Sequence, residues 1–351
     1  MLNFPQFRLV VIDTHVDTHG EELGPVRNSL YLLLLAAFAL AGCNKSSPRA
    51  GGSASTQSGP WQVTATVGMV ADLVRSVGGE RVEVVQLFGP GVDPHLHKAS
   101  RDDVQNMMQA DIIFYSGLML EGKMTDSLVK LARGKPVVAV TEAIDPSALL
   151  EPDDFAGHYD PHVWMDVSAW SQCVNVIVEE LSKLDPAAAV DYRQRGAQLR
   201  QQLAELHAYG QQAIASIPAE SRILITSHDA FNYFGRAYGL EVLGVQGLST
   251  ESEAGLQRIN ELVDLLVDRK VQAVFVESSV PRKNIDSLVE GAGSRGHQVR
   301  IGEKELFSDA MGAAATYEGT YIGMLDHNIT LVARGLGGEA PAAGFQGKLS
   351  P

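Results

Sequence analysis

Cysteine and positive charge are both scarce in this sequence of 351 residues. It has two cysteines, and its 28 lysines and arginines are outnumbered by 42 acidic residues, which gives a formal net charge of −14. Binding to nucleic acid depends on clustered lysine and arginine, so this balance argues against a nucleic-acid partner. It favours cations as ligands, although an acidic balance also serves solubility.

Apolar runs long enough to cross a membrane are missing as well. The apolar run at 30–40 (LYLLLLAAFAL) falls short of the roughly 20 residues that span a bilayer, but it fits the core of a secretory signal peptide. The run leads into Leu-Ala-Gly-Cys, which resembles a bacterial lipobox and predicts that Cys43 is lipidated and becomes the mature N-terminus. The alternative is a buried cysteine in an apolar segment. The Gly/Ser/Pro-rich residues 43–60 predict a flexible tether and favour the lipoprotein.

The first 25 residues do not suit a signal peptide, because they are rich in Asp and Glu whereas a signal begins with positive charge. We interpret this as a miscalled start, place the true start at Val26, and assign residues 1–42 to the signal. With Cys43 lipidated, Cys173 is the one cysteine left, so no disulfide can form within the mature chain. It lies in an apolar helical pattern and is expected in the core.

Beyond the tether, short β-branched runs alternate with amphipathic stretches, which predicts an α/β fold with parallel sheets. The predicted strands are residues 62–67, 82–87, 111–115, 136–140, 222–226, 241–245, 272–277 and 298–301. The stretch 166–217 has no strand pattern, and its second part predicts one helix of about 30 residues. Ser100 with Asp103 predicts a capping box, and Pro281 predicts the first turn of a later helix.

These patterns predict two lobes, each a mostly parallel sheet flanked by helices, joined by one long rigid helix. The boundaries that we expect are 61–185 for the N-terminal lobe, 186–218 for the linking helix, 219–337 for the C-terminal lobe and 338–351 for a flexible tail.

The tripeptide Asp-Pro-His occurs twice, ending at His95 and at His162. Proline fixes its own φ and keeps the preceding residue extended, so each imidazole leaves a stiff loop in a defined direction. Asp93 and Asp160 are candidate acceptors that orient the two rings. Either histidine alone would be read as an ordinary loop residue. Two of them in corresponding places predict a pair of metal ligands.

Two more candidate ligands follow predicted strands of the second half. His228 comes directly after RILIT, and Asp309 comes after QVRI and before the last helix. All four candidates thus fall at or beyond the carboxyl ends of strands, where open α/β sheets bind ligands. Three imidazoles and one carboxylate complete a tetrahedral shell for Zn²⁺.

Nearly the whole mature chain, from about Trp61 to Leu336, resembles the cluster A-I family of periplasmic metal-binding proteins, the TroA-like group that feeds zinc, manganese or iron to ABC transporters. The resemblance rests on GPGVDPHLH, ADIIFYSGLMLEGKM, YDPHVWMDVSAW, TSHDAFNYFGRAYGLEVLGVQGLSTESEAG, VFVESSVPRKNI and LFSDAMGAAATYEGTYIGMLDHN. It implies two α/β lobes on a rigid helix, an ABC permease and its ATPase as partners, and no enzymatic activity. It assigns the metal-ligand role to His95, His162, His228 and Asp309.

The resemblance leaves Zn²⁺ and Mn²⁺ as candidate ions. Manganese-dedicated members typically have Glu where this chain has His228, and three nitrogen donors favour zinc. Many zinc-specific members also carry a His-rich loop before the second ligand, whereas here only His158 lies between His97 and His162. The three nitrogen donors keep zinc as the favoured ion. Metal supply and the partner permease can also determine which ion is bound.

The expected protein is an extracytoplasmic monomer in the periplasm or at the cell surface, held to the membrane by its lipid. A surface adhesin or a zinc-buffering lipoprotein would have the same fold and site. A metallohydrolase is disfavoured, because four protein ligands close the metal shell and no HExxH motif is present.

The remaining histidines beyond the signal are not expected to bind metal. We expect His97 and His158 at the rim of the cleft rather than among the ligands, and His207, His297 and His327 as surface or packing residues. Glu277 lies at the end of a predicted strand. Its side chain is expected either to face the cleft or to hydrogen-bond the next turn, and the sequence favours neither.

Overall fold

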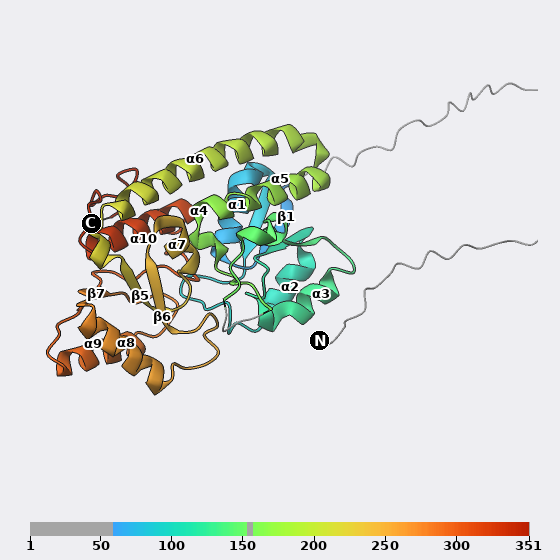
Figure 1. Ribbon diagram of the computed structural model, residues 1–351. Coiled ribbons are helices and arrows are strands. Elements are labelled where there is room, and N and C mark those ends of the chain that lie inside the picture. The colour runs from blue at the N-terminus through green and yellow to red at the C-terminus, as the bar shows by residue number, and fades with distance from the viewer. Residues whose placement is uncertain (1–58, 153–156, 351) are drawn as a thin grey trace, which may run out of the picture. The chain divides into compact units, whose positions relative to one another are not determined.

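The structure is a computed structural model that describes residues 59–152 and 157–350 (Figure 1). These residues belong to one compact unit of the chain. The signal peptide, the lipidation site Cys43 and most of the tether lie outside the described residues, so those expectations remain predictions. The described residues form parallel sheets flanked by helices, which confirms the predicted fold class.

The N-terminal lobe is built on a four-stranded parallel sheet in the order β2-β1-β3-β4. Its strands are β1 (Trp61–Ala65), β2 (Val82–Gln86), β3 (Ile112–Tyr115) and β4 (Val137–Ala139). The connecting helices are α1 (Gly68–Gly78), α2 (Arg101–Gln109) and α3 (Thr125–Leu131). Because all four strands are parallel, the loops after them leave the sheet at one edge.

The predicted capping box is present at the start of α2. The Ser100 hydroxyl accepts from the backbone N–H of Asp103 at 3.1 Å, and the Asp103 carboxylate accepts from the backbone N–H of Ser100 at 2.8 Å. The prediction for Pro281 is wrong, because α9 begins at Lys283 with Arg282 as its N-cap. Pro281 therefore lies just outside the helix, in the loop that leads into it.

One long helix follows the first lobe. After α4 (Val167–Trp170) and α5 (Cys173–Leu184), α6 runs from Ala189 to Ala215, about 40 Å at 1.5 Å per residue. It packs against α1 of the N-terminal lobe and against α10 of the C-terminal lobe, and Figure 1 shows it passing alongside both. The close approaches occur at glycine, since a Cβ on Gly196 would meet Val178, and one on Gly210 would meet Tyr238.

The C-terminal lobe has two short parallel pairs of strands, β5-β6 and β7-β8. The strands are β5 (Ile223–His228), β6 (Glu241–Gln246), β7 (Ala273–Val274) and β8 (Arg300–Ile301). The helices are α7 (Asn232–Tyr238), α8 (Leu256–Asp268), α9 (Lys283–Ser294) and α10 (Tyr321–Gly335). The predicted strand at 272–277 is regular over two residues only. The segment 272–277 still connects the β7-β8 pair to β5, because the backbone N–H of Phe275 donates to the carbonyl of Ile225 at 2.9 Å.

Short 3₁₀ helices complete the described elements: η1 (Gly79–Arg81), η2 (Gly122–Met124), η3 (Val140–Ala143), η4 (Pro146–Ala148), η6 (Val163–Met165), η7 (Pro186–Ala188) and η8 (Ala219–Ser221). The residues after α10 fold back on that helix. Phe345 N–H donates to the Asp326 carboxylate at 2.8 Å, and Leu349 is buried.

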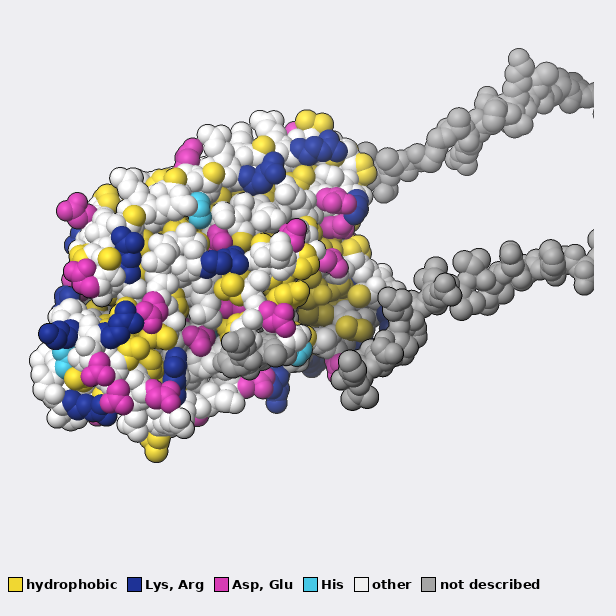
Figure 2. Space-filling model, viewed as in Figure 1, with side chains coloured by type: hydrophobic (Ala, Val, Ile, Leu, Met, Phe, Trp, Pro, Cys, Tyr) yellow, Lys and Arg dark blue, Asp and Glu magenta, His cyan; other side chains and the backbone are white. Residues whose placement is uncertain are grey.

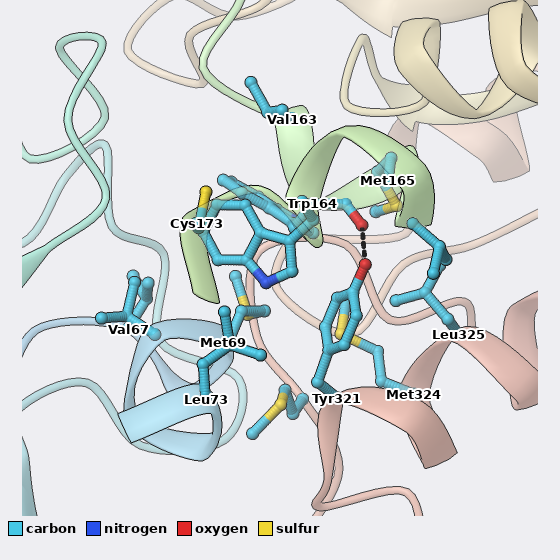
Figure 3. Packing of buried hydrophobic residues seen from close by; sticks show 14 of the residues in the cluster. Val67, Met69, Leu73, Val163, Trp164, Met165, Cys173, Tyr321, Met324 and Leu325 are labelled. Carbon is cyan, nitrogen blue, oxygen red and sulfur yellow. Dashed lines mark hydrogen bonds between the residues drawn. The ribbon is translucent and has the colours of Figure 1, made fainter. Parts of the chain in front are cut away.

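The largest hydrophobic core contains residues of both lobes (Figure 3). Figure 3 shows Trp164 between side chains of α1, such as Leu73, and side chains of α10, such as Tyr321. The Tyr321 hydroxyl donates to the backbone carbonyl of Trp164 at 2.7 Å. Cys173 is fully buried in this cluster, as expected for core filler. The two lobes therefore share one hydrophobic core.

The surface mixes both signs of charge, and on the face in Figure 2 hydrophobic side chains gather near α3. A pocket of about 400 Å³ in the N-terminal lobe is lined by residues that include Tyr115, Leu118, Met119, Leu128 and Val129. None of the four candidate ligands lines this pocket. Among the described residues, no helix is both long and apolar enough to cross a membrane.

Candidate metal centre

The structure brings the four candidate ligands together. His95 lies in the loop after β2, His162 directly before η6, His228 at the end of β5 and Asp309 in the loop between β8 and α10. One donor atom from each lies within 4.8 Å of every other, and all four residues are buried. Two come from each half of the chain, as the strand-end pattern predicted, so the site closes only when both lobes contribute.

The spacing of the donor atoms suits one metal ion. Nε2 of His95 lies 3.2 Å from Nε2 of His162, and Nε2 of His228 lies 3.2 Å from Oδ2 of Asp309. Nε2 of His162 is 3.5 Å from Oδ1 of Asp309. Nitrogen ligands at zinc's usual bond length are about 3.3 Å apart when arranged as a tetrahedron. These three separations are close to that value, and Nε2 of His95 lies 3.9 Å from Oδ2 of Asp309, so the donors are grouped closely enough to bind one ion.

Three of these buried atoms have no hydrogen-bond partner. They are Nε2 of His228 and both carboxylate oxygens of Asp309. Leaving a carboxylate buried and without hydrogen bonds is costly, and folded proteins avoid it unless a metal or another charge compensates. Nε2 of His228 faces Oδ2 of Asp309 at 3.2 Å, and the Asp309 oxygens also face Nε2 of His95 and of His162. The arrangement therefore fits a cation bound between the lobes.

The ring of His162 is oriented by Asp160, as the sequence predicted. Oδ1 of Asp160 accepts from Nδ1 of His162 at 2.8 Å and from its backbone N–H at 2.9 Å. Because Nδ1 donates, the neutral ring directs the lone pair of Nε2 into the site. Asp160 is also bound across the cleft, since the side-chain amide of Asn232 donates to its Oδ2 at 3.2 Å.

The ring of His228 has a matching support that the sequence left open. Glu277 is buried, and its Oε2 lies 2.5 Å from Nδ1 of His228 while its Oε1 accepts from the backbone N–H at 2.9 Å. Glu277 therefore faces the site, behind His228. Its position at the end of a predicted strand was the only sequence signal, and the pairing itself depends on how two strands lie side by side.

Asp93 differs from the expectation. It accepts from the backbone N–H of His95 at 2.8 Å, and its other oxygen accepts from the hydroxyl of Thr250 at 2.5 Å. Among the described residues, no carboxylate accepts from Nδ1 of His95. Asp93 therefore fixes the backbone of His95 and not its ring, because its second oxygen is turned toward the opposite lobe.

The buried charges around the site shift the pKa values of its histidines in different directions. Burial lowers the pKa of His95 to about 4, despite the nearby charge of Asp309. Burial also disfavours a charged His228, but the carboxylates of Glu277 and Asp309 outweigh it and raise the pKa of that ring well above its ordinary value. Burial would raise the pKa of Asp309, yet the three imidazoles hold it well below its usual range. Asp309 is thus a carboxylate at neutral pH.

The other histidines that the structure describes lie outside the cluster. Nε2 of His97 donates to the Asp103 carboxylate at 2.9 Å, and its ring packs on Phe88, with ring centroids 4.4 Å apart. His158 is exposed. His207 packs on Tyr238, His297 pairs with the carbonyl of Val271, and His327 is buried with its Nε2 at the carbonyl of Glu305. These contacts agree with rim and packing roles.

Comparison with known proteins gives the family. The family model described as zinc-uptake complex component A, periplasmic (ZnuA), matches residues 63–335. The chain belongs to this family. It is 47% identical over 304 residues to the manganese-binding lipoprotein MntA of Bacillus subtilis, covering 87% of this chain and 97% of that protein. It is 48% identical over 272 residues to the zinc-binding protein TroA of Treponema pallidum, covering 77% of this chain and 87% of TroA.

The fold agrees with that assignment. The solved structure of the periplasmic zinc-binding protein TroA from Treponema pallidum superposes with a TM-score of 0.77 at 47% identity, covering 79% of this chain and 99% of that chain. The resemblance stated from the sequence motifs is therefore confirmed. The two similar proteins are named for different metals, so family membership leaves the ion to the chemistry of the donor set.

Proposed function

We propose that this chain is the extracytoplasmic substrate-binding component of an ABC importer for a divalent transition metal. It binds one ion between its lobes and delivers it to a membrane permease that works with an ATPase. The observation that carries the proposal is the buried cluster of four donor residues, in which both oxygens of Asp309 and Nε2 of His228 have no other partner.

His95, His162, His228 and Asp309 are the proposed ligands, and Zn²⁺ is the favoured ion with Mn²⁺ as the alternative. Three nitrogen donors and one carboxylate suit zinc, and the spacing of the donor atoms supports a tetrahedral ion. Similar proteins named for zinc and for manganese make both ions reasonable substrates.

We propose that the chain itself catalyses no reaction. A catalytic zinc keeps a coordination position for water or substrate and needs a general base beside it. Here four protein donors fill the tetrahedron. The nearby carboxylates of Asp160 and Glu277 are already engaged with the Nδ1 atoms of ligand histidines.

We propose that the protein works as a monomer held to the membrane by a lipid on Cys43. Similar proteins named as lipoproteins support this anchor. A Cys43→Ala variant should move from the membrane fraction to the soluble fraction. Retention of that variant in the membrane after salt washing would reject the proposed anchor.

The ion is tested by metal analysis of protein purified without chelator, followed by competition titrations of zinc against manganese on the metal-free protein. We expect one equivalent of metal and tighter binding of zinc. If the protein binds one equivalent but prefers manganese, the transport proposal stands and manganese becomes the proposed substrate. Absence of binding for both ions would reject the function.

A further inference from the structure

The three proposed histidine ligands are not held equally. Carboxylates accept from Nδ1 of His162 and of His228, whereas the ring of His95 has no such support among the described residues. The His95 side chain is also the most exposed of the four, at 6% against 0% for the other three. His95 is therefore the ligand nearest to solvent and the one whose position depends most on its loop.

That loop is held from the opposite lobe. Asp93 accepts from the backbone N–H of His95 with one oxygen and from the hydroxyl of Thr250 with the other, at 2.8 and 2.5 Å. Thr250 is buried in the loop 247–255 that follows β6. A continuous path of hydrogen bonds thus joins the C-terminal lobe to the backbone of a ligand on the N-terminal lobe.

A second contact of the same loop provides a comparison. Glu251 pairs with Lys123 of the N-terminal lobe at 2.8 Å, but these side chains are 48% and 35% exposed. Exposed ion pairs contribute little, because water and salt screen them. The Thr250–Asp93 hydrogen bond is partly buried and is made to a carboxylate, so it is stronger than an exposed ion pair.

We propose that Thr250 is a positioning residue for metal retention: through Asp93 it holds His95 in the closed site, and metal leaves on the His95 side when this hydrogen bond breaks. The inference rests on the proposed function, because it assigns a step in the release of the proposed substrate. Because Thr250 and Asp93 belong to different lobes, a movement that separates these loops would break the contact, so the hydrogen bond favours the closed site.

The test is a chelator chase. Zinc-loaded full-length protein is mixed with excess 4-(2-pyridylazo)resorcinol, and the dissociation rate is compared for wild type, Thr250→Val, Thr250→Ser and Glu251→Gln. Valine keeps the shape of threonine and removes the hydroxyl, so release should accelerate by about tenfold or more, while the rate of zinc capture stays within twofold. Serine should restore slow release. Glu251→Gln should stay within about twofold of wild type.

Thermal unfolding of the metal-free variants separates positioning from folding, because Thr250→Val should still unfold in one cooperative transition when no ion is bound. Wild-type release kinetics in Thr250→Val would overturn the inference, as would fast release in Thr250→Ser or equal acceleration by Glu251→Gln. Wild-type protein that binds no zinc or manganese would instead reject the proposed function, so the two failures are distinguishable.

Discussion

Glu277 holds His228 by two hydrogen bonds, 2.5 Å from Nδ1 and 2.9 Å from the backbone nitrogen. Asp160 makes the same pair of contacts to His162 at 2.8 and 2.9 Å. Each carboxylate fixes the tautomer that presents Nε2 to the site and adds negative charge behind the ring. The rings of the two proposed ligands are therefore oriented on both lobes before an ion arrives, and binding of an ion would displace the proton that the carboxylates favour on His228.

Replacing Glu277 by Gln should weaken zinc binding by about 10- to 100-fold, the usual cost of losing such an outer partner. The amide keeps the size of the side chain but loses the charge that favours proton donation from Nδ1. Isothermal titration calorimetry measures the effect, and Glu303→Gln is a matched control because Glu303 is exposed on the same lobe. An affinity of Glu277→Gln equal to that of the control would show that Glu277 has no part in binding.

Asp309→Asn should lower zinc affinity by at least about 100-fold, since the ion loses its one anionic ligand among three neutral imidazoles. The variant should still fold, because asparagine conserves the volume and the interactions that it weakens are those with the neighbouring imidazoles of the site. Calorimetry gives the affinity and circular dichroism the fold, with Asp286→Asn on the surface as control. Unchanged affinity in a folded Asp309→Asn would remove this residue from the proposed ligands.

Much of the fold could be predicted because its signals are local. The first four strands lie within two residues of their predicted bounds, and the capping box at Ser100 is present. The strand at 272–277 was overestimated. Its apolar residues are buried as a strand predicts, but only Ala273 and Val274 find ladder partners on β8. Burial and pairing are separate requirements, and the sequence shows only the first.

The candidate site was predictable to the extent that each residue follows a strand. His95 and His162 were marked by their shared tripeptide, and parallel strands placed them at one edge. The roles of Glu277 and Thr250 were not predictable, because each acts through a partner about 50 or more positions away in sequence. Asp93 shows the same limit, since its neighbour His95 was evident but the competing partner on the other lobe was not.

Zinc should stabilise the folded protein against heat. An ion that binds only the native state at 100 times its dissociation constant adds about 2.7 kcal/mol to the free energy of unfolding, which corresponds to a rise of about 5 °C or more in Tm. Differential scanning calorimetry of chelator-stripped protein, with and without zinc, measures the shift. EDTA should reverse it, and magnesium should produce none, because it prefers oxygen ligands in octahedral geometry. Equal shifts with zinc and magnesium would contradict a specific site.

Cys173 should make the folded protein less stable in alkaline solution. Its thiol is buried beside Trp164 and Met69 in the core that joins the lobes, and burial raises its pKa well above the ordinary thiol value. The unfolded chain loses this proton near pH 8.5 while the native chain keeps it. The native state then binds more protons, so the free energy of unfolding falls as pH rises above that value.

The size of the effect can be isolated in a Cys43→Ser background, where Cys173 is the one remaining thiol. Between pH 8.5 and 10 the free energy of unfolding should decrease by up to about 1.4 kcal/mol per pH unit more than in a Cys173→Ala variant. Urea titrations at each pH give the difference, and the constant cost of the cavity in the alanine variant cancels from the slope. Parallel slopes would mean that the thiol ionises in the native protein and that the core shared by the two lobes opens to solvent.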